Sequence, residues 1–209
     1  MRSGSQLLAA AILALLFVSG CSLLPEAPPS PARHDFGPMR ADAAPLPWSE
    51  AEVTAPEWLQ DSALHYRLLY ANPTEIRAYT RDSWVAPPPE LLANRLNGGP
   101  RTGSRRLTLK LRSFEQVFDR PGHARVVMAF HASLTPTQDG APIAERDFRF
   151  ESPTSTADAP GALSQFPVLI EKAMAALREW ALQPLHSMEA GRIDGSPNLA
   201  GMAIQPTVR

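Results

Sequence analysis

The sequence predicts an α/β fold in which a largely antiparallel sheet packs against a long C-terminal amphipathic helix. Two patterns support this class. Residues 107–150 alternate apolar and polar side chains, as the strands of a half-buried sheet do. Residues 163–181 repeat apolar side chains every three or four positions, as a helix buried along one side does. With 209 residues, 44% of them hydrophobic, the chain is long enough for one domain with a buried core and appended segments.

The residues ahead of position 107 predict shorter elements. They are a strand over residues 34–37, a hairpin of strands 63–70 and 75–79 around a turn at Asn72-Pro73, a helix over residues 90–96 and a polar loop over residues 101–106. The prolines before residue 90 suit the first turn of that helix, and Asn97-Gly98-Gly99 is typical of its end.

The main sheet is expected to be a meander of about three strands. Three leucines of the first strand (Leu107, Leu109, Leu111) share one face, but Phe114 and Phe118 have the opposite parity. Either a bulge near Ser113 resets the register or both faces of this strand are covered. Further strands are expected over residues 126–134 and 144–150, joined through a tight turn at Asp139-Gly140.

The long helix is expected to begin near a cap at Ser164. This start would leave Pro167 in the first turn, where its missing N–H costs little. Pro184 is expected to end the helix, because proline disfavours helical geometry in the residue before it.

The N-terminal residues predict export followed by lipidation. Arg2 is followed by an apolar run of about 12 residues, which is too short to span a bilayer. Val18-Ser19-Gly20-Cys21 resembles the bacterial lipobox, in which small residues let a peptidase cut before a cysteine that carries diacylglycerol. Cys21 is the single cysteine of the chain, so it has no disulfide partner within the chain. An ordinary signal peptide with an incidental cysteine and a buried helix are the alternatives.

The chain therefore divides into four segments. We expect a lipoprotein signal peptide at residues 1–20, a Pro-rich tether at residues 21–33, a domain at residues 34–186 and a flexible C-terminal tail at residues 187–209. Val18, Ser19 and Gly20 would be recognised by the peptidase. Position 22 is Ser, not the Asp that resembles an inner-membrane retention signal, which favours the outer membrane.

Composition and motifs exclude several functional classes. The formal net charge of −1 provides no concentrated basic field, so nucleic acid is not an expected partner. The five histidines are scattered without metal-ligand spacing, and nucleophile motifs are missing from the sequence, so we expect no enzyme activity, metal or cofactor. Residues 97–106 could cradle a phosphate, but a solvated loop is the favoured interpretation.

One region is rich in the residue types that dominate protein interfaces. We predict a partner-binding surface from Trp58, Leu59, Tyr66, Arg67 and Trp84. For each tryptophan taken alone, a place in the core is the stronger alternative.

Several separate motifs follow one another in a characteristic order along residues 34–185. They include Ala55-Pro-x-Trp-Leu-x-Asp-Ser62, Tyr66-Arg67-Leu68, Ser83-Trp84, Pro88-Pro89-x-Leu91-Leu92, Leu109-x-Leu111-x-x-Phe114-Glu-Gln-Val-Phe118-Asp and Arg146-Asp-Phe148. In this order they resemble the ABC-type transport auxiliary lipoprotein family, the PqiC-like proteins. The resemblance implies a three-layer α/β sandwich around a mixed sheet. It also implies a non-enzymatic role beside an MCE-type ABC lipid transport system, with contacts to its MCE subunit.

The chain departs from this family in its middle part. The family has a longer middle helix and one more strand before the strand at Leu107, whereas residues 97–104 here bridge directly. A missing strand would expose backbone donors at the sheet edge beside Leu107, and that edge could be an attachment site or be shielded by the tail.

These observations predict an outer-membrane-anchored, periplasmic accessory lipoprotein that tethers and binds the MCE subunit. The alternative is a direct phospholipid carrier, which predicts a cavity of several hundred cubic ångströms between the long helix and the sheet. The transported lipid, the transporter served and any homo-oligomer are not determined by the sequence.

Overall fold

The computed structural model describes residues 30–39, 44–136 and 140–183. The chain divides into two units, Met1–Ser30 and Pro31–Arg209, and the fold below is that of the second unit. The predicted signal peptide, Cys21, the turn residue Asp139, Pro184 and the tail at residues 187–209 lie outside the described residues.

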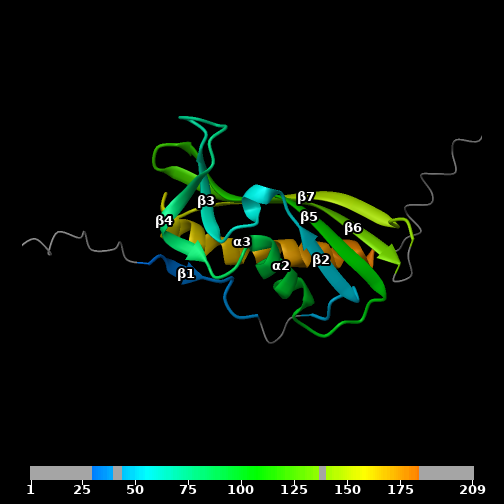
Figure 1. The fold of residues 1–209 in the computed structure, drawn as a ribbon. Helices are drawn as coiled ribbons and strands as arrows, with labels where there is room; N and C mark the ends of the chain where they lie inside the picture. Colours follow the sequence, from blue (N-terminus) through cyan, green and yellow to red (C-terminus); the bar gives the residue numbers. More distant parts are fainter. Residues whose placement is uncertain (1–29, 40–43, 137–139, 184–209) are drawn as a thin grey trace, which may run out of the picture. The chain divides into compact units, whose positions relative to one another are not determined.

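The described chain forms one mixed sheet and two α-helices (Figure 1). The elements are β1 (Ala32–His34), β2 (Glu50–Thr54), the 3-10 turn η1 (Glu57–Leu59), β3 (Ala63–Leu68), β4 (Arg77–Trp84), α2 (Pro88–Asn97), β5 (Arg105–Arg120), β6 (His123–Pro136), β7 (Ala144–Pro153) and α3 (Ala159–Leu182). The seven strands follow the order β1-β4-β3-β5-β6-β7, with β2 paired to β5 off this path. The predicted class, a mixed α/β fold with a long C-terminal helix, is confirmed.

The strand β5 organises the sheet. One edge pairs antiparallel with β6 along nearly its whole length, from Arg105 to Arg120. The other edge is shared by two short strands that run parallel to it: β2 pairs with Arg106–Lys110, and β3 pairs with Gln116–Phe118. The turn η1 lies between β2 and β3 in the sequence, so one stretch of chain follows β5, leaves it and rejoins it.

This pairing corrects the expectation of an exposed edge beside Leu107. Val53 of β2 pairs with Leu109, and Ala51 pairs with Leu107, so the edge is occupied by the segment before the hairpin. Five residues with only two apolar side chains give little strand signal by themselves. The hydrogen-bonding edge of β5 supplies what the local sequence lacks.

Both alternatives for the Phe114 parity change are realised. The register of β5 against β6 shifts between Leu111 and Ser113, which is the bulge. Beyond the bulge every residue from Phe114 to Phe118 is buried, so both faces of this half of β5 are covered.

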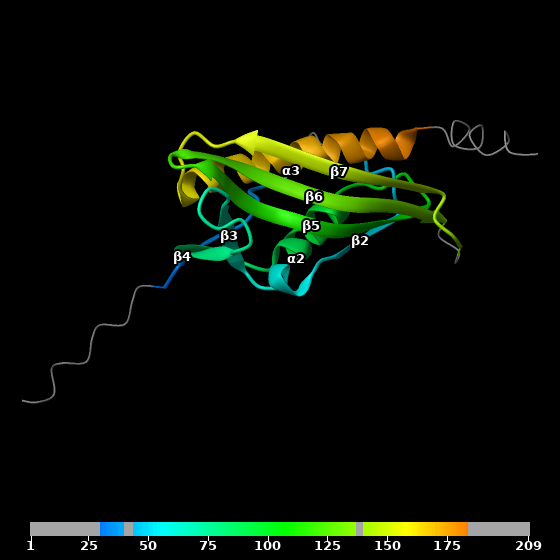
Figure 2. The ribbon, with the colours of Figure 1, turned by 90° about the horizontal axis from the view of Figure 1, so that it is seen from above.

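Both helices lie against the same face of the sheet. Phe166 of α3 stacks on Phe114 with ring centroids 4.4 Å apart and meets Trp84 edge-on at 5.4 Å. Arg95 of α2 reaches Glu171 of α3 at 3.5 Å, which joins the two helices. Figure 2 shows β5, β6 and β7 side by side, with α3 lying along β7. The resemblance implied a layer on each side of the sheet, whereas here the second face carries no helix among the described residues.

The long helix begins earlier than expected. Its cap is Asp158, whose carboxylate accepts a hydrogen bond from the Gly161 N–H at 2.9 Å, and Ser164 lies inside the helix. Pro167 is therefore interior and removes one hydrogen bond of the ladder. The local pattern did not reveal this start because Asp158 is followed by Pro160 and Gly161, which look like a loop. Gly161 is needed there, since a Cβ would lie 2.1 Å from the Thr156 carbonyl oxygen.

Other boundaries differ by a few residues. The first strand spans Ala32–His34, not residues 34–37, and so begins within the segment assigned to the tether. The chain turns after it at Gly37, which has a φ of 74° and donates its N–H to the Asp35 carboxylate. β4 continues through Trp84, beyond the expected end at Tyr79, because its last residues pair with β1. α2 begins at Pro88 and ends at Asn97, where its end was predicted.

The aromatic contact between α3 and β5 should dominate stability. Phe166 is fully buried, so we expect Phe166→Ala to lower the free energy of unfolding by about 3–5 kcal/mol, through lost apolar contact and the cavity left behind. Urea unfolding measures this. Val168→Ala, on the exposed side of the same helix, is the control and should change stability by less than about 1 kcal/mol. Equal effects of the two substitutions would contradict the assignment of the buried side.

Candidate functional site

The five residues predicted to bind a partner do not form one surface. Leu59 is 0% exposed and Trp84 is 1% exposed. Both belong to the main hydrophobic core, in which Trp84 packs between Phe36 and Phe166. This corrects the expectation that they contact a partner, because such contact would require the core to open.

The remaining three residues are divided between the two faces of the sheet. Tyr66 pairs with Gln116 and packs on Tyr79 and Phe118, on the side of the helices. Arg67 is the next residue of β3, so its side chain lies on the opposite face, which we call the open face. Trp58 reaches the open face from η1, where it meets His65 edge-on at 5.5 Å. Trp58 and Arg67 are thus the two predicted residues that share a surface.

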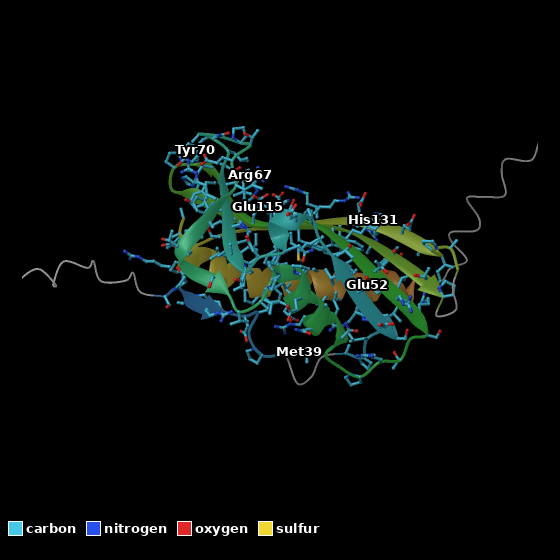
Figure 3. All side chains as sticks on the ribbon, viewed as in Figure 1. Met39, Glu52, Arg67, Tyr70, Glu115 and His131 are labelled. Carbon is cyan, nitrogen blue, oxygen red and sulfur yellow. The ribbon has the colours of Figure 1, made fainter. Side chains whose placement is uncertain are left out.

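Arg67 is held by an ion pair with Glu115 of β5. Its Nε donates to Glu115 Oε2 at 3.1 Å, and its Nη2 donates to Oε1 at 3.4 Å (Figure 3). The Glu115 side chain is only 8% exposed and the Arg67 side chain 18%, so each charge depends on the other for compensation. No local sequence pattern indicates this partner, because Glu115 is a single acidic residue within a run of buried residues.

The same guanidinium also fixes the loop between β3 and β4. Its Nη1 donates to the carbonyl oxygen of Pro73 at 3.0 Å. Arg67 therefore connects the sheet to the loop and orients it. These contacts give Arg67 a role in positioning the loop, in addition to its predicted role in contacting a partner.

His65 lies beside this ion pair and is almost fully buried. Burial lowers its pKa, while the nearby carboxylates of Asp61 and Glu115 act in the opposite direction. Its Nε2 is 3.6 Å from Asp61, and its Nδ1 is buried without a hydrogen-bond partner among the described residues. The lowered pKa keeps the imidazole neutral at neutral pH, so Glu115 has Arg67 as its close cationic partner.

The loop between β3 and β4 presents apolar side chains that the sequence interpretation missed. Leu69 is 36% exposed, Tyr70 48% and Ile76 36%. We call these three residues the apolar tip; Tyr70 is labelled at the projecting end of the hairpin in Figure 3. The sequence feature that could have indicated this tip is the apolar pair Leu69-Tyr70, which lies just before the turn at Asn72-Pro73, where polar residues are usual.

The cavity expected of a lipid carrier is not enclosed between helix and sheet. That space is filled by core side chains such as Phe114, Phe166 and Ile170. An open groove of about 400 Å³ lies instead between β7 and the end of α3. Its lining combines Phe148, Phe150 and Trp180 with charged and polar groups (Arg146, Asp147, Arg149, Glu179, Gln183).

Neither a metal-binding cluster nor a membrane-spanning helix occurs within the described residues. No group of three or more His, Cys, Asp or Glu side chains there could hold a metal ion. None of the helices described has the length and apolar character needed to cross a membrane.

The described chain is therefore an open mixed α/β sheet with helices on one face, and its candidate site is a surface, not a cleft. Its fold is similar to that of a Xanthomonas campestris protein assigned to DUF330, with a TM-score of 0.57 at 17% identity over 78% of this chain and 98% of that one. An uncharacterized protein of known structure is similar with a TM-score of 0.50 at 16% identity, over 65% of this chain and 95% of that one. These likenesses show a shared fold. The sequence matches no protein-family model and no curated protein.

Removing one partner of the ion pair between Arg67 and Glu115 should destabilise the fold more than replacing both partners. We expect Glu115→Leu to lower the free energy of unfolding by about 3 kcal/mol or more, because it leaves a partly buried guanidinium without its carboxylate. The double variant Arg67→Met/Glu115→Leu should cost less than either single change, since no charge is then left unpaired. Urea unfolding of the wild type, Arg67→Met, Glu115→Leu and the double variant, analysed as a double-mutant cycle, measures the coupling. Additive effects would show that the two side chains act independently.

Proposed function

We propose that this chain is a lipid-anchored, periplasm-facing lipoprotein of the outer membrane that serves as an accessory component of an MCE-type ABC lipid transport system. The observation that carries the proposal is the lipobox-like Val18-Ser19-Gly20-Cys21 placed before a Pro-rich stretch and a folded domain. Acylation at Cys21 would bury long hydrocarbon chains, at about 0.8 kcal/mol per methylene, so that the anchor holds permanently.

The partner follows from the ordered motifs shared with the auxiliary lipoproteins. The mixed sheet and the C-terminal helix agree with the fold class that this resemblance implies. The sequence interpretation assigns no catalytic residues, and the proposed mechanism is tethering combined with binding of the MCE subunit. Confinement to the membrane face raises the effective concentration of the domain near the transporter, so a modest interface suffices.

The open face around Trp58 and Arg67 is the proposed docking surface. Trp58 is half-buried, which leaves part of the indole available, and it rests on His65. Arg67 is fixed by Glu115, so its position costs little entropy on binding. A rigid aromatic side chain beside an ordered guanidinium is the kind of pair that forms an interface hot spot.

Lipidation makes the first prediction of this proposal. Cells that express the chain and receive labelled palmitate should incorporate the label into the wild-type protein. Cys21→Ser should abolish the label and release the protein from the membrane fraction, because the acyl chains are the anchor. A Ser22→Ala variant is the control and should remain labelled. An unlabelled wild-type protein would contradict the proposed anchor.

Docking makes the second prediction. In a capture experiment with the MCE subunit, Trp58→Ala should weaken binding by about 30-fold, the loss typical of a hot-spot residue. Val168→Ala, on the exposed side of α3, should bind as the wild type does. Each variant is first shown to unfold cooperatively at the wild-type midpoint. Undiminished capture by folded Trp58→Ala would remove this surface from the proposal.

A further inference from the structure

From the apolar tip we propose a second membrane contact: Leu69, Tyr70 and Ile76 insert into the interfacial region of the bilayer that holds the lipid anchor. This inference rests on the proposed lipidation of Cys21 and adds a site to it. With two attachments the domain would have a fixed orientation on the membrane, with the β3–β4 hairpin facing the lipid.

The tip suits a lipid interface in its chemistry. It combines two aliphatic side chains with a tyrosine, whose ring is apolar and whose hydroxyl stays hydrated, and tyrosine is enriched at the headgroup level of membranes. Exposed Arg77 follows Ile76 directly and forms an ion pair with Glu75 at 2.7 Å, so these two charges compensate each other. Exposed Arg120, the last residue of β5, lies next to the β5–β6 turn and adds a positive charge that favours anionic headgroups.

The loop backbone is already paired, which lowers the cost of entering an apolar region. The Leu68 carbonyl oxygen accepts from the N–H groups of Ala71 and Asn72, and the Glu75 N–H donates to the Asn72 carbonyl oxygen. The Asn72 side chain accepts from both the N–H and the hydroxyl of Thr74. Backbone groups that satisfy one another within the loop do not have to lose water without compensation.

The loop is also held in place from the sheet. Arg67 donates to the Pro73 carbonyl oxygen while paired with Glu115, and the Leu69 N–H donates to the Phe118 carbonyl oxygen at 2.9 Å. An apolar tip that is rigid before insertion pays little ordering entropy when it binds. The buried ion pair therefore stabilises the conformation of the loop that carries the apolar tip, as well as the pairing of β3 with β5.

The tether is long enough for both contacts at once. Ala32 of β1 pairs with Asp82 of β4, and six residues of chain lead from Asp82 back to Ile76. Even fully extended, this path places the tip at most about 27 Å from Ala32. About 11 residues lead from Cys21 to Ala32, and a chain of that length can span at most about 36–40 Å. The anchor and the tip can therefore occupy the same bilayer.

The test uses the full, lipidated chain in vesicles of phosphatidylethanolamine and phosphatidylglycerol. Because acylation consumes the native thiol, Ala71→Cys introduces the one reactive thiol, beside the tip but outside it, for an environment-sensitive fluorophore. Its emission should shift to shorter wavelength and be quenched by brominated acyl chains. The same label at Glu52→Cys, exposed on β2, is the matched control and should show neither effect. Leu69→Ser/Tyr70→Ser in the Ala71→Cys protein should lose most of the quenching.

The outcomes separate the two proposals. If wild-type protein without an introduced cysteine reacts with a maleimide, Cys21 is free and the proposed anchor fails, and this inference fails with it. If wild-type protein does not react but the label at position 71 is as unquenched as that at position 52, the anchor stands and the tip does not touch lipid. A spectral shift that needs added MCE subunit would assign the tip to protein docking and would likewise overturn the membrane contact.

Discussion

The pairing of two short strands along one edge of β5 is the constraint on which the rest of the structure depends. β2 and β3 both run parallel to β5, and the chain between them must leave the sheet at η1 and return. The break coincides with the bulge of β5 between Leu111 and Ser113. This arrangement places Leu59 in the core and carries Trp58 to the open face, so the candidate surface is a consequence of sheet topology.

The two faces of the sheet differ in composition: one is aromatic and covered by the helices, and the other carries charged side chains. The face under α2 and α3 is built from aromatic contacts such as Phe114 on Phe166, which bury large apolar areas and fix the helices. The open face carries charged ladders, with His131 and Arg112 both close to Asp147. No helix covers the open face among the described residues, so part of it is free for a partner, and the ion pair of Arg67 with Glu115 is a largely buried polar feature there.

The β3–β4 hairpin contains residues that stabilise the fold and residues that belong to the proposed binding surfaces. Arg67 fixes the loop through Pro73 and is itself fixed by Glu115, while β4 pairs with β1, the first strand of the described residues. The hairpin therefore joins the tether side of the domain to the open face. An attachment at the apolar tip would orient Trp58 relative to the membrane and would limit the directions from which a partner could approach.

By itself, the sequence determined the class of the fold, the meander of long strands and the long helix. Each of these rests on a local pattern: alternation along β5 and three- and four-residue spacing in α3. Only the tertiary structure decided that β2 fills the edge beside Leu107, that Trp84 is core and that Tyr66 and Arg67 face opposite ways. These features depend on which distant segments pair, and the local sequence of one segment does not predict its pairing partner.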